Sequence, residues 1–143
     1  MSFFVDANVI VYAVAEDDSR QPGSIEIMDA ISDARAVGVA NSAVIEEVWH
    51  LEMSGRVPGL DGQARGAHTI LRPLLPIDDE VLDIAFGLEL PADTRLGAND
   101  RLHAATCIRY GITDIVTADR AFDDVEQLHR IDPIDQGALA DLW

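Results

Sequence analysis

Short apolar runs alternate along the chain with longer segments in which apolar residues recur at helical spacing. The runs predict strands at residues 3–5, 37–40 and 115–117, and a weak fourth strand at Ile131. The spacing predicts helices at residues 9–15, 25–34, 43–53, 79–88 and 99–110, a further helix ending at Leu71, and an extended segment at 74–77. Strands separated by helices are typical of a mostly parallel sheet covered on both faces, so we predict an α/β protein.

Polar residues and glycines mark where these helices begin and end. Ser42 is the expected N-cap of the helix at 43–53, and Asp78 is the expected N-cap of the helix at 79–88. Both side chains can accept hydrogen bonds from the free backbone N–H groups of a first helical turn. Gly111 is expected to end the helix at 99–110, because glycine readily adopts the left-handed conformation found after helices.

The chain length and the apolar content predict one folded domain. The chain has 143 residues, of which 48% are hydrophobic, so it has the usual size of a domain and can fill a core. No repeat or linker divides it, and we expect a single domain over residues 1–143. The longest apolar run, at 9–15, is far shorter than the roughly 20 residues that span a bilayer. Together with a single cysteine, Cys107, this indicates a cytoplasmic protein without a membrane segment.

The charged residues exclude several classes of enzyme. The chain has 26 acidic residues against 10 basic ones, a net charge of -16, and every basic residue is an arginine. Without lysine, Schiff-base enzymes and P-loop nucleotide hydrolases are excluded. The negative charge also argues against indiscriminate binding of nucleic acid, although a local site stays open. A salt-rich cytoplasm would screen such a surface, so a halophilic source is one hypothesis.

Two acidic residues directly follow predicted strands. Asp6 ends the first strand and Asp119 follows the strand at 115–117. In a parallel sheet the carboxyl ends of the strands meet at one edge, where functional crevices form, so we expect these two side chains to be neighbours. For either residue alone, a helix cap or a turn is an equally good explanation.

Two further acids lie on predicted helices. Val44 and Val48 mark the apolar stripe of the helix at 43–53, and Glu47 borders this stripe more closely than Glu46 does. Asp100 lies at the start of the helix at 99–110. Taken singly, these residues could be solvated helix acids or a helix cap.

The combination of these four acids points to a cation site. Carboxylates about 5 Å apart repel each other by about 3 kcal/mol per pair at an effective dielectric constant near 20. A pocket that collects four of them must therefore bind protons or divalent cations. All-oxygen ligands favour Mg²⁺ or Mn²⁺, which lower the pKa of water and neutralise phosphoryl oxygens in displacement reactions.

The chain resembles a known family at the same four positions. VDAN at Asp6, SAVIEEVWHL at Glu47, NDRLHAATCIRYG at Asp100 and VTADRAFDDV at Asp119 are similar to the four acidic motifs of PIN-domain ribonucleases, especially VapC-type toxins. The resemblance covers nearly the whole chain. It implies a three-layer α/β/α sandwich with a mostly parallel central sheet, and endonucleolytic cleavage of RNA with Mg²⁺ or Mn²⁺. It also implies a homodimer that a VapB-like antitoxin inhibits.

The resemblance assigns roles residue by residue. It implies four metal-binding and catalytic acids, with a candidate fifth: Asp6, Glu47, Asp100 and Asp119, and then Asp123. Adjacent acids blur the second and fifth positions, where Glu46 and Asp124 are the alternatives. Polar groups expected to shape the site and contact substrate are Asn8 and Thr117. Arg101 and Arg120 are candidate phosphate contacts because a guanidinium matches phosphate geometry, and surface ion pairs are an equally good account of both.

Two other functions remain open at this point. Glu47 and His50 spell E-x-x-H, and Asp100 and His103 spell D-x-x-H, which is the spacing found in di-iron carboxylate oxidoreductases. Those proteins need four long helices, which the predicted strands disfavour. Both histidines are expected instead to pack at helix borders or to pair with acids.

The other alternative is a PIN-like module that binds RNA or protein without cleaving it, which the presence of all four acids disfavours.

Overall fold

A four-stranded sheet forms the centre of the protein in the computed structural model, which describes all residues from Met1 to Trp143. The strand order is β2-β1-β3-β4, and all three neighbouring pairs are parallel. The strands are β1 (Ser2–Val5), β2 (Val37–Val39), β3 (Asp114–Val116) and β4 (His129–Ile131). All four strands were predicted from the apolar runs. The prediction of a mostly parallel sheet is confirmed, and the sheet is parallel throughout.

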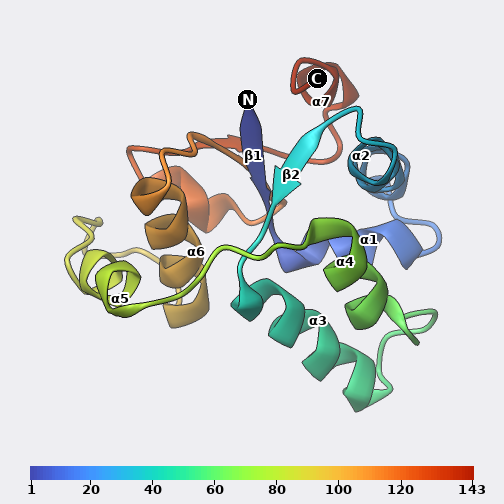
Figure 1. Ribbon diagram of the computed structural model, residues 1–143, viewed down its shortest axis with the longest axis horizontal. Coiled ribbons are helices and arrows are strands. Elements are labelled where there is room, and N and C mark those ends of the chain that lie inside the picture. The colour runs from blue at the N-terminus through green and yellow to red at the C-terminus, as the bar shows by residue number, and fades with distance from the viewer.

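Helices cover both faces of the sheet. They are α1 (Ala7–Val14), α2 (Gln21–Ser32), α3 (Ser42–Ser54), α4 (Gln63–Leu71), α5 (Asp79–Phe86), α6 (Ala98–Arg109) and α7 (Gln136–Ala140), with a 3-10 helix, η1 (Arg120–Asp124). Figure 1 shows α5 and α6 on one side of β1 and β2, and α1, α2 and α7 on the other. The expected three-layer α/β/α sandwich is therefore confirmed. None of the helices has both the length and the apolar character needed to cross a bilayer.

The ends of two helices differ from the prediction for local reasons. Helix α3 is capped by Asn41 and not by Ser42: the Asn41 side chain accepts a hydrogen bond from the backbone N–H of Val44, and Ser42 is already helical. Helix α2 begins at Gln21, four residues earlier than predicted, with Pro22 in its first turn, where proline is well tolerated. The predicted cap at Asp78 and the end at Gly111, whose φ is +69°, are confirmed.

The sequence pattern did not predict three short helical segments, which are the start of α4, helix η1 and helix α7. The first turns of α4 lie inside the glycine- and proline-bearing stretch from 55 to 66. Helices η1 and α7 have only five residues each, too few for a helical period to be visible. The segment at 74–77 is extended as predicted, but it makes only an isolated bridge, in which Leu75 N–H donates to the Ala40 carbonyl at 2.9 Å.

The strand order places a crevice beyond β1 and β3. From β1 the chain first builds β2 on one side of it and later builds β3 on the other, so the winding direction reverses between β1 and β3. In sheets of this kind, ligands bind outside the carboxyl ends of the strands at this reversal. The strand β1 is also the centre of the core, since Phe3, Phe4 and Val5 are 1%, 0% and 0% exposed.

Candidate metal centre

Four acidic side chains from distant parts of the sequence line one cavity at this crevice. The cavity has a volume of about 310 Å³ and is lined by nine residues, among them Asp6, Glu47, Asp100 and Asp119. Asp6 joins β1 to α1, Glu47 lies on α3, Asp100 lies in the first turn of α6, and Asp119 follows β3. The fold thus brings together the four acids that the sequence motifs singled out.

Asp6 is held rigidly at the base of the cavity. It is 4% exposed, and its Oδ1 accepts a hydrogen bond from the Ala7 backbone N–H at 2.7 Å, so it also caps α1. Its Oδ2 accepts hydrogen bonds from the Thr117 hydroxyl at 2.7 Å and from the Asn8 side-chain amide at 3.3 Å. The capping explanation and the site explanation of Asp6 therefore apply together, because one carboxylate oxygen serves each.

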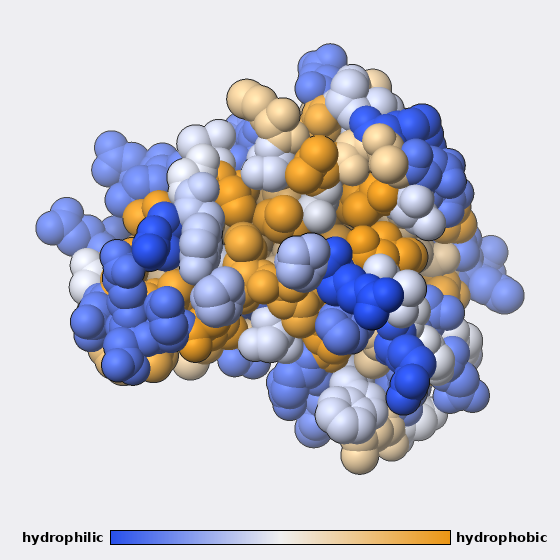
Figure 2. Space-filling model, viewed as in Figure 1, coloured by the Kyte–Doolittle hydropathy of each residue, from blue (hydrophilic) through white to orange (hydrophobic).

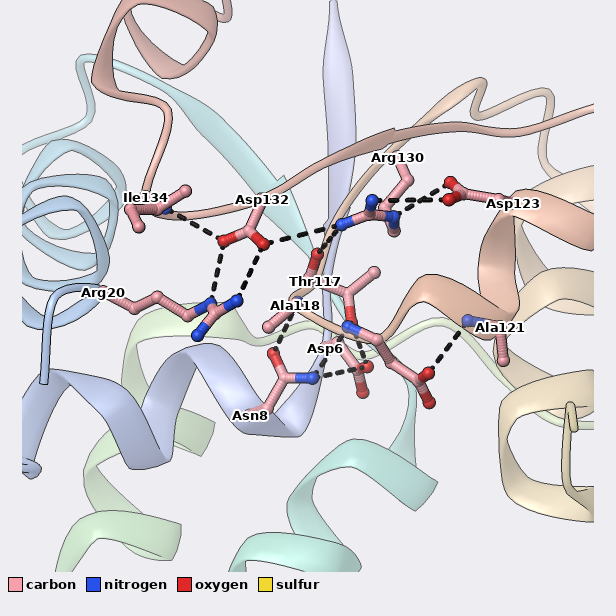
Figure 3. Close-up of polar contacts among 11 residues, drawn as sticks. Asp6, Asn8, Arg20, Thr117, Ala118, Ala121, Asp123, Arg130, Asp132 and Ile134 are labelled. Carbon is pink, nitrogen blue, oxygen red and sulfur yellow. Dashed lines mark hydrogen bonds and ion pairs between the residues drawn. The ribbon is translucent and has the colours of Figure 1, made fainter.

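Asn8 and Thr117 form a small network that orients Asp6 (Figure 3). The Asn8 amide nitrogen donates to the Thr117 hydroxyl oxygen at 2.9 Å, and the Asn8 amide oxygen accepts from the Ala118 N–H at 3.3 Å. The Thr117 hydroxyl also accepts from the Asp119 N–H at 3.1 Å. The two polar residues that were expected to shape the site thus connect the ends of β1 and β3.

The structure distinguishes between the two adjacent glutamates of α3. Glu47 lines the cavity and its side chain is 24% exposed, whereas Glu46 is exposed and does not line it. Glu46 and His50 instead line a neighbouring cavity of about 440 Å³, which Glu47 borders as well. Only Glu47 faces the other three acids, as the helical phase of the apolar stripe indicated.

Asp123, the candidate fifth acid, lies outside the cavity. Its Oδ1 accepts a hydrogen bond from Arg130 Nε at 2.9 Å, and its side chain is 55% exposed. Figure 3 shows Asp123 turned toward Arg130 and away from Asp6. The neighbouring Asp124 accepts a hydrogen bond from the Thr94 hydroxyl at 2.8 Å. Both acids therefore have partners other than the four cavity acids.

The two candidate phosphate contacts have different surroundings. Arg101 donates from Nε to the Leu96 carbonyl at 2.9 Å, which ties its guanidinium to the loop before α6. Arg120 is exposed and lines a cavity of about 370 Å³ next to Asp119 and Arg95. Arg95 was not singled out from the sequence, because the loop that carries it has no motif.

His103 lies among the four acids. It is 0% exposed, and its Nε2 lies 3.0 Å from Glu47 Oε1 and 3.8 Å from Asp6 Oδ1. Atoms of Asp6, Asp100 and His103 that could bind a metal lie within 4.8 Å of one another. The expectation that His103 pairs with an acid is confirmed, but its central position was missed. The D-x-x-H spacing with Asp100 was the signal for it.

Burial, with the nearby negative charges acting in the same direction, raises the pKa of two of these acids. Burial, and then the charge of Asp6, raises the pKa of Asp100 from its usual 3.8 to about 7, and Asp119 and Glu47 act in the same direction. Burial also raises the pKa of Asp6, although His103 and the Thr117 hydrogen bond oppose it. Without a bound cation, Asp100 and Asp6 therefore hold a proton more readily than ordinary aspartates do.

We expect the metal-free protein to lose stability as the pH rises from about 4 to about 7. Between the ordinary pKa of 3.8 and the folded value near 7, the folded state binds more protons at Asp100 than the unfolded state does. Its stability therefore falls as the pH rises through this window. Thermal unfolding with chelator at several pH values measures the slope. Saturating Mg²⁺ should remove the slope, because the cation replaces the proton, and identical profiles with and without Mg²⁺ would contradict this.

The donor set fits a hard divalent cation. Four carboxylates in one cavity supply the oxygen ligands that Mg²⁺ and Mn²⁺ prefer, and a divalent cation there would offset their mutual repulsion. The di-iron alternative does not fit, because the centre of the fold is a sheet and His50 lies outside the cavity. The residues present therefore fit Mg²⁺ or Mn²⁺.

Comparisons with known proteins agree with this geometry. The profile of the family described as PIN domain matches residues 3–128. Ribonuclease VapC23 of Mycobacterium tuberculosis is 32% identical over 119 residues, which cover 81% of this chain and 91% of that protein. Two solved structures share the fold: VapBC2 from Rickettsia felis bound to a promoter DNA fragment (TM-score 0.65, 17% identity, 92% and 98% of the two chains) and FitAcB from Neisseria gonorrhoeae (TM-score 0.61, 17% identity, 93% and 99%).

Proposed function

The chain belongs to the PIN domain family, and from this premise we propose that it is a metal-dependent endoribonuclease that hydrolyses RNA phosphodiesters. The observation that carries the proposal is the meeting of Asp6, Glu47, Asp100 and Asp119 in one cavity at the winding reversal of the sheet. The similarity to Ribonuclease VapC23 supports RNA as the substrate. It also supports a role as the toxin of a VapBC-like toxin-antitoxin pair.

Each side chain of the site has a task that follows from its position. Asn8 and Thr117 hold the Asp6 carboxylate in one orientation, and Asp119 is fixed by the Ala121 N–H at 2.9 Å. Glu47 and Asp100 complete the ring of oxygens from two helices. Mg²⁺ or Mn²⁺ bound there supplies a Lewis acid that activates water and neutralises charge on a phosphoryl group.

No protein nucleophile is needed for this reaction. Cys107 is 0% exposed, and burial raises the pKa of its thiol well above the ordinary value. A buried neutral thiol is a poor nucleophile. Cys107 is instead one of the buried residues of the hydrophobic core.

The RNA would be bound locally, because most of the surface is acidic. Arg120 is exposed beside Asp119, so we assign it the role of a phosphate contact next to the metal site. Arg101 is tied to the Leu96 carbonyl through one nitrogen, and its remaining N–H groups are the proposed second contact. The net charge of -16 repels the RNA backbone, so affinity depends on these local contacts.

Partner chains are the second part of the proposal. The similarity to a VapBC2 complex supports an antitoxin of the VapB type. A homodimer is supported by the outer strand β2, where Val37 is 58% exposed. Figure 2 shows apolar side chains gathered on this face over β2 and the segment between α4 and α5. Exposed apolar strand edges are places where another chain pairs, and we propose a second copy of the chain there.

Cleavage assays with the purified full-length protein test the function. We expect it to cut RNA internally with Mg²⁺ or Mn²⁺, to stop with chelator, and to regain activity when excess metal is added. Asp6→Asn should bind RNA but not cleave it, while Asp29→Asn, an exposed acid on α2, should cleave like the wild type. Cleavage that survives chelation, or that survives Asp6→Asn, would contradict the proposal. Binding without any cleavage by the wild type would identify a non-cleaving module instead.

A further inference from the structure

We infer that His103 is a positioning residue of the metal site and not one of its ligands. His103 keeps its proton on Nε2 and donates it in a hydrogen bond to Glu47; this inference rests on the proposed function, because it presupposes the metal site. In this way His103 holds the Glu47 carboxylate toward Asp6. The ligands of the cation are then all oxygens, although a histidine nitrogen lies close enough to be counted among them.

The position of the ring is fixed by its surroundings. His103 is 0% exposed, and its ring lies against Phe4 with centroids 5.3 Å apart and planes tilted by 38°. Its Nε2 lies 3.0 Å from Glu47 Oε1, which is hydrogen-bond distance, and 3.8 Å from Asp6 Oδ1. One edge of the imidazole therefore faces the acids while the rest of the ring is packed in the core.

The other ring nitrogen decides where the proton sits. Nδ1 is buried and has no hydrogen-bond partner. A neutral imidazole carries one N–H, and placing it on Nδ1 would leave a buried donor unsatisfied and would turn the Nε2 lone pair toward the oxygens of Glu47 and Asp6. Placing the proton on Nε2 leaves the Nδ1 lone pair without a partner, but it gives Glu47 a donor and avoids the repulsion between the Nε2 lone pair and the two carboxylates. The geometry thus selects the Nε2–H tautomer.

This tautomer excludes metal ligation by His103. A nitrogen can bind a cation only through its lone pair, and a histidine that binds metal almost always donates its other N–H to an acceptor. Nε2 is the nitrogen that faces the cavity, and Nδ1 has no acceptor nearby to stabilise a proton there. His103 therefore acts on the cation only through Glu47.

The hydrogen bond matters because the Glu47 side chain borders a second cavity, toward which it could turn. Its side chain is 24% exposed and borders both the metal cavity and the neighbouring cavity that contains Glu46 and His50. The bond to His103 joins α3 to α6 across the site and selects the first of these positions. Without it, Glu47 can rotate toward solvent, and the cation loses one of its four carboxylates.

Two substitutions separate a positioning role from a ligand role. His103→Gln keeps an N–H donor near the position of Nε2, whereas His103→Leu removes it at a similar volume. We expect His103→Leu to weaken Mn²⁺ binding by about 10- to 100-fold, as loss of an outer-shell partner does, and His103→Gln to stay within a few fold of wild type. Mn²⁺ titration followed by electron paramagnetic resonance measures the affinity without RNA. His129→Gln, on an exposed side chain far from the site, is the control.

Two spectroscopic measurements on the wild-type protein decide the question even if a variant fails to fold. Nitrogen NMR of the histidines should show His103 as the Nε2–H tautomer, and pulsed paramagnetic resonance of bound Mn²⁺ should show no directly coordinated imidazole nitrogen. An Nδ1–H tautomer, a coordinated nitrogen, or unchanged Mn²⁺ affinity in His103→Leu would overturn the inference. None of these measurements involves cleavage, so a protein that fails to cut RNA would refute the proposed function and leave this inference standing.

Discussion

Replacing Asp100 with asparagine is expected to abolish RNA cleavage while making the metal-free protein more stable. Asp100 lines the cavity, where burial and then the charges of Asp6, Asp119 and Glu47 act against its ionisation. The substitution removes this repulsion without removing any hydrogen bond of the carboxylate seen in the structure. It also removes one of the proposed metal ligands. A bound cation supplies several kcal/mol of transition-state stabilisation, so weakening its binding should reduce the cleavage rate by about 10³-fold or more.

The opposite signs of these two effects make the test specific. At pH 8 with chelator, the Tm of Asp100→Asn should exceed that of the wild type by about 2–4 °C, which corresponds to about 1 kcal/mol for a domain of this size. Mg²⁺ should stabilise the wild type and have little effect on the variant. Asp83→Asn, an exposed acid on α5, should change neither quantity. A variant that cleaves normally, or that unfolds at a lower temperature than wild type without metal, would contradict the assignment of Asp100.

Replacing Phe4 with alanine is expected to have the largest effect on stability. Phe4 is 0% exposed on β1, where it is paired with Val39 of β2 and Ile115 of β3 and lies against His103. Truncating a buried phenylalanine to alanine costs about 3–5 kcal/mol, a large part of the roughly 5–15 kcal/mol that keeps a domain folded. We expect the Tm to fall by about 10 °C or more.

A matched phenylalanine on the surface provides the control. Phe86, at the end of α5, is 82% exposed, so Phe86→Ala should change the free energy of unfolding by about 0.5 kcal/mol or less. Denaturant unfolding of both variants measures the difference. Similar losses in the two variants would show that Phe4 is not part of the central core.

Much of the fold and the four cavity acids could be predicted because each left a local pattern. An apolar strand that ends in an acid, as at Asp6, needs only a few neighbouring residues to be noticed. Glu47 was preferred over Glu46 because a helix has a fixed rotation per residue, and the structure places only Glu47 among the other acids. In both cases the information lies within one or two helical turns.

The rest depends on contacts between distant residues, which no local pattern contains. The central position of His103 follows from α6 meeting α3 and β1, so the sequence shows only a histidine three residues after Asp100. Asp123 binds Arg130 because η1 folds back against β4. Asn41 and Ser42 are both good caps by residue type, so the sequence does not separate them. In the structure Asn41 caps α3, and its amide nitrogen also donates to the Thr106 hydroxyl of α6 at 2.9 Å.

The order in which the chain contributes to the site has a consequence for its synthesis on the ribosome. Asp6 is translated early. Thr117, which hydrogen-bonds to Asp6, and Asp119 follow β3 in the sequence and therefore leave the ribosome late. A nascent chain without β3 lacks both the network that orients Asp6 and the fourth acid. A growing chain therefore cannot assemble the four-acid site until β3 and the residues that follow it have left the ribosome.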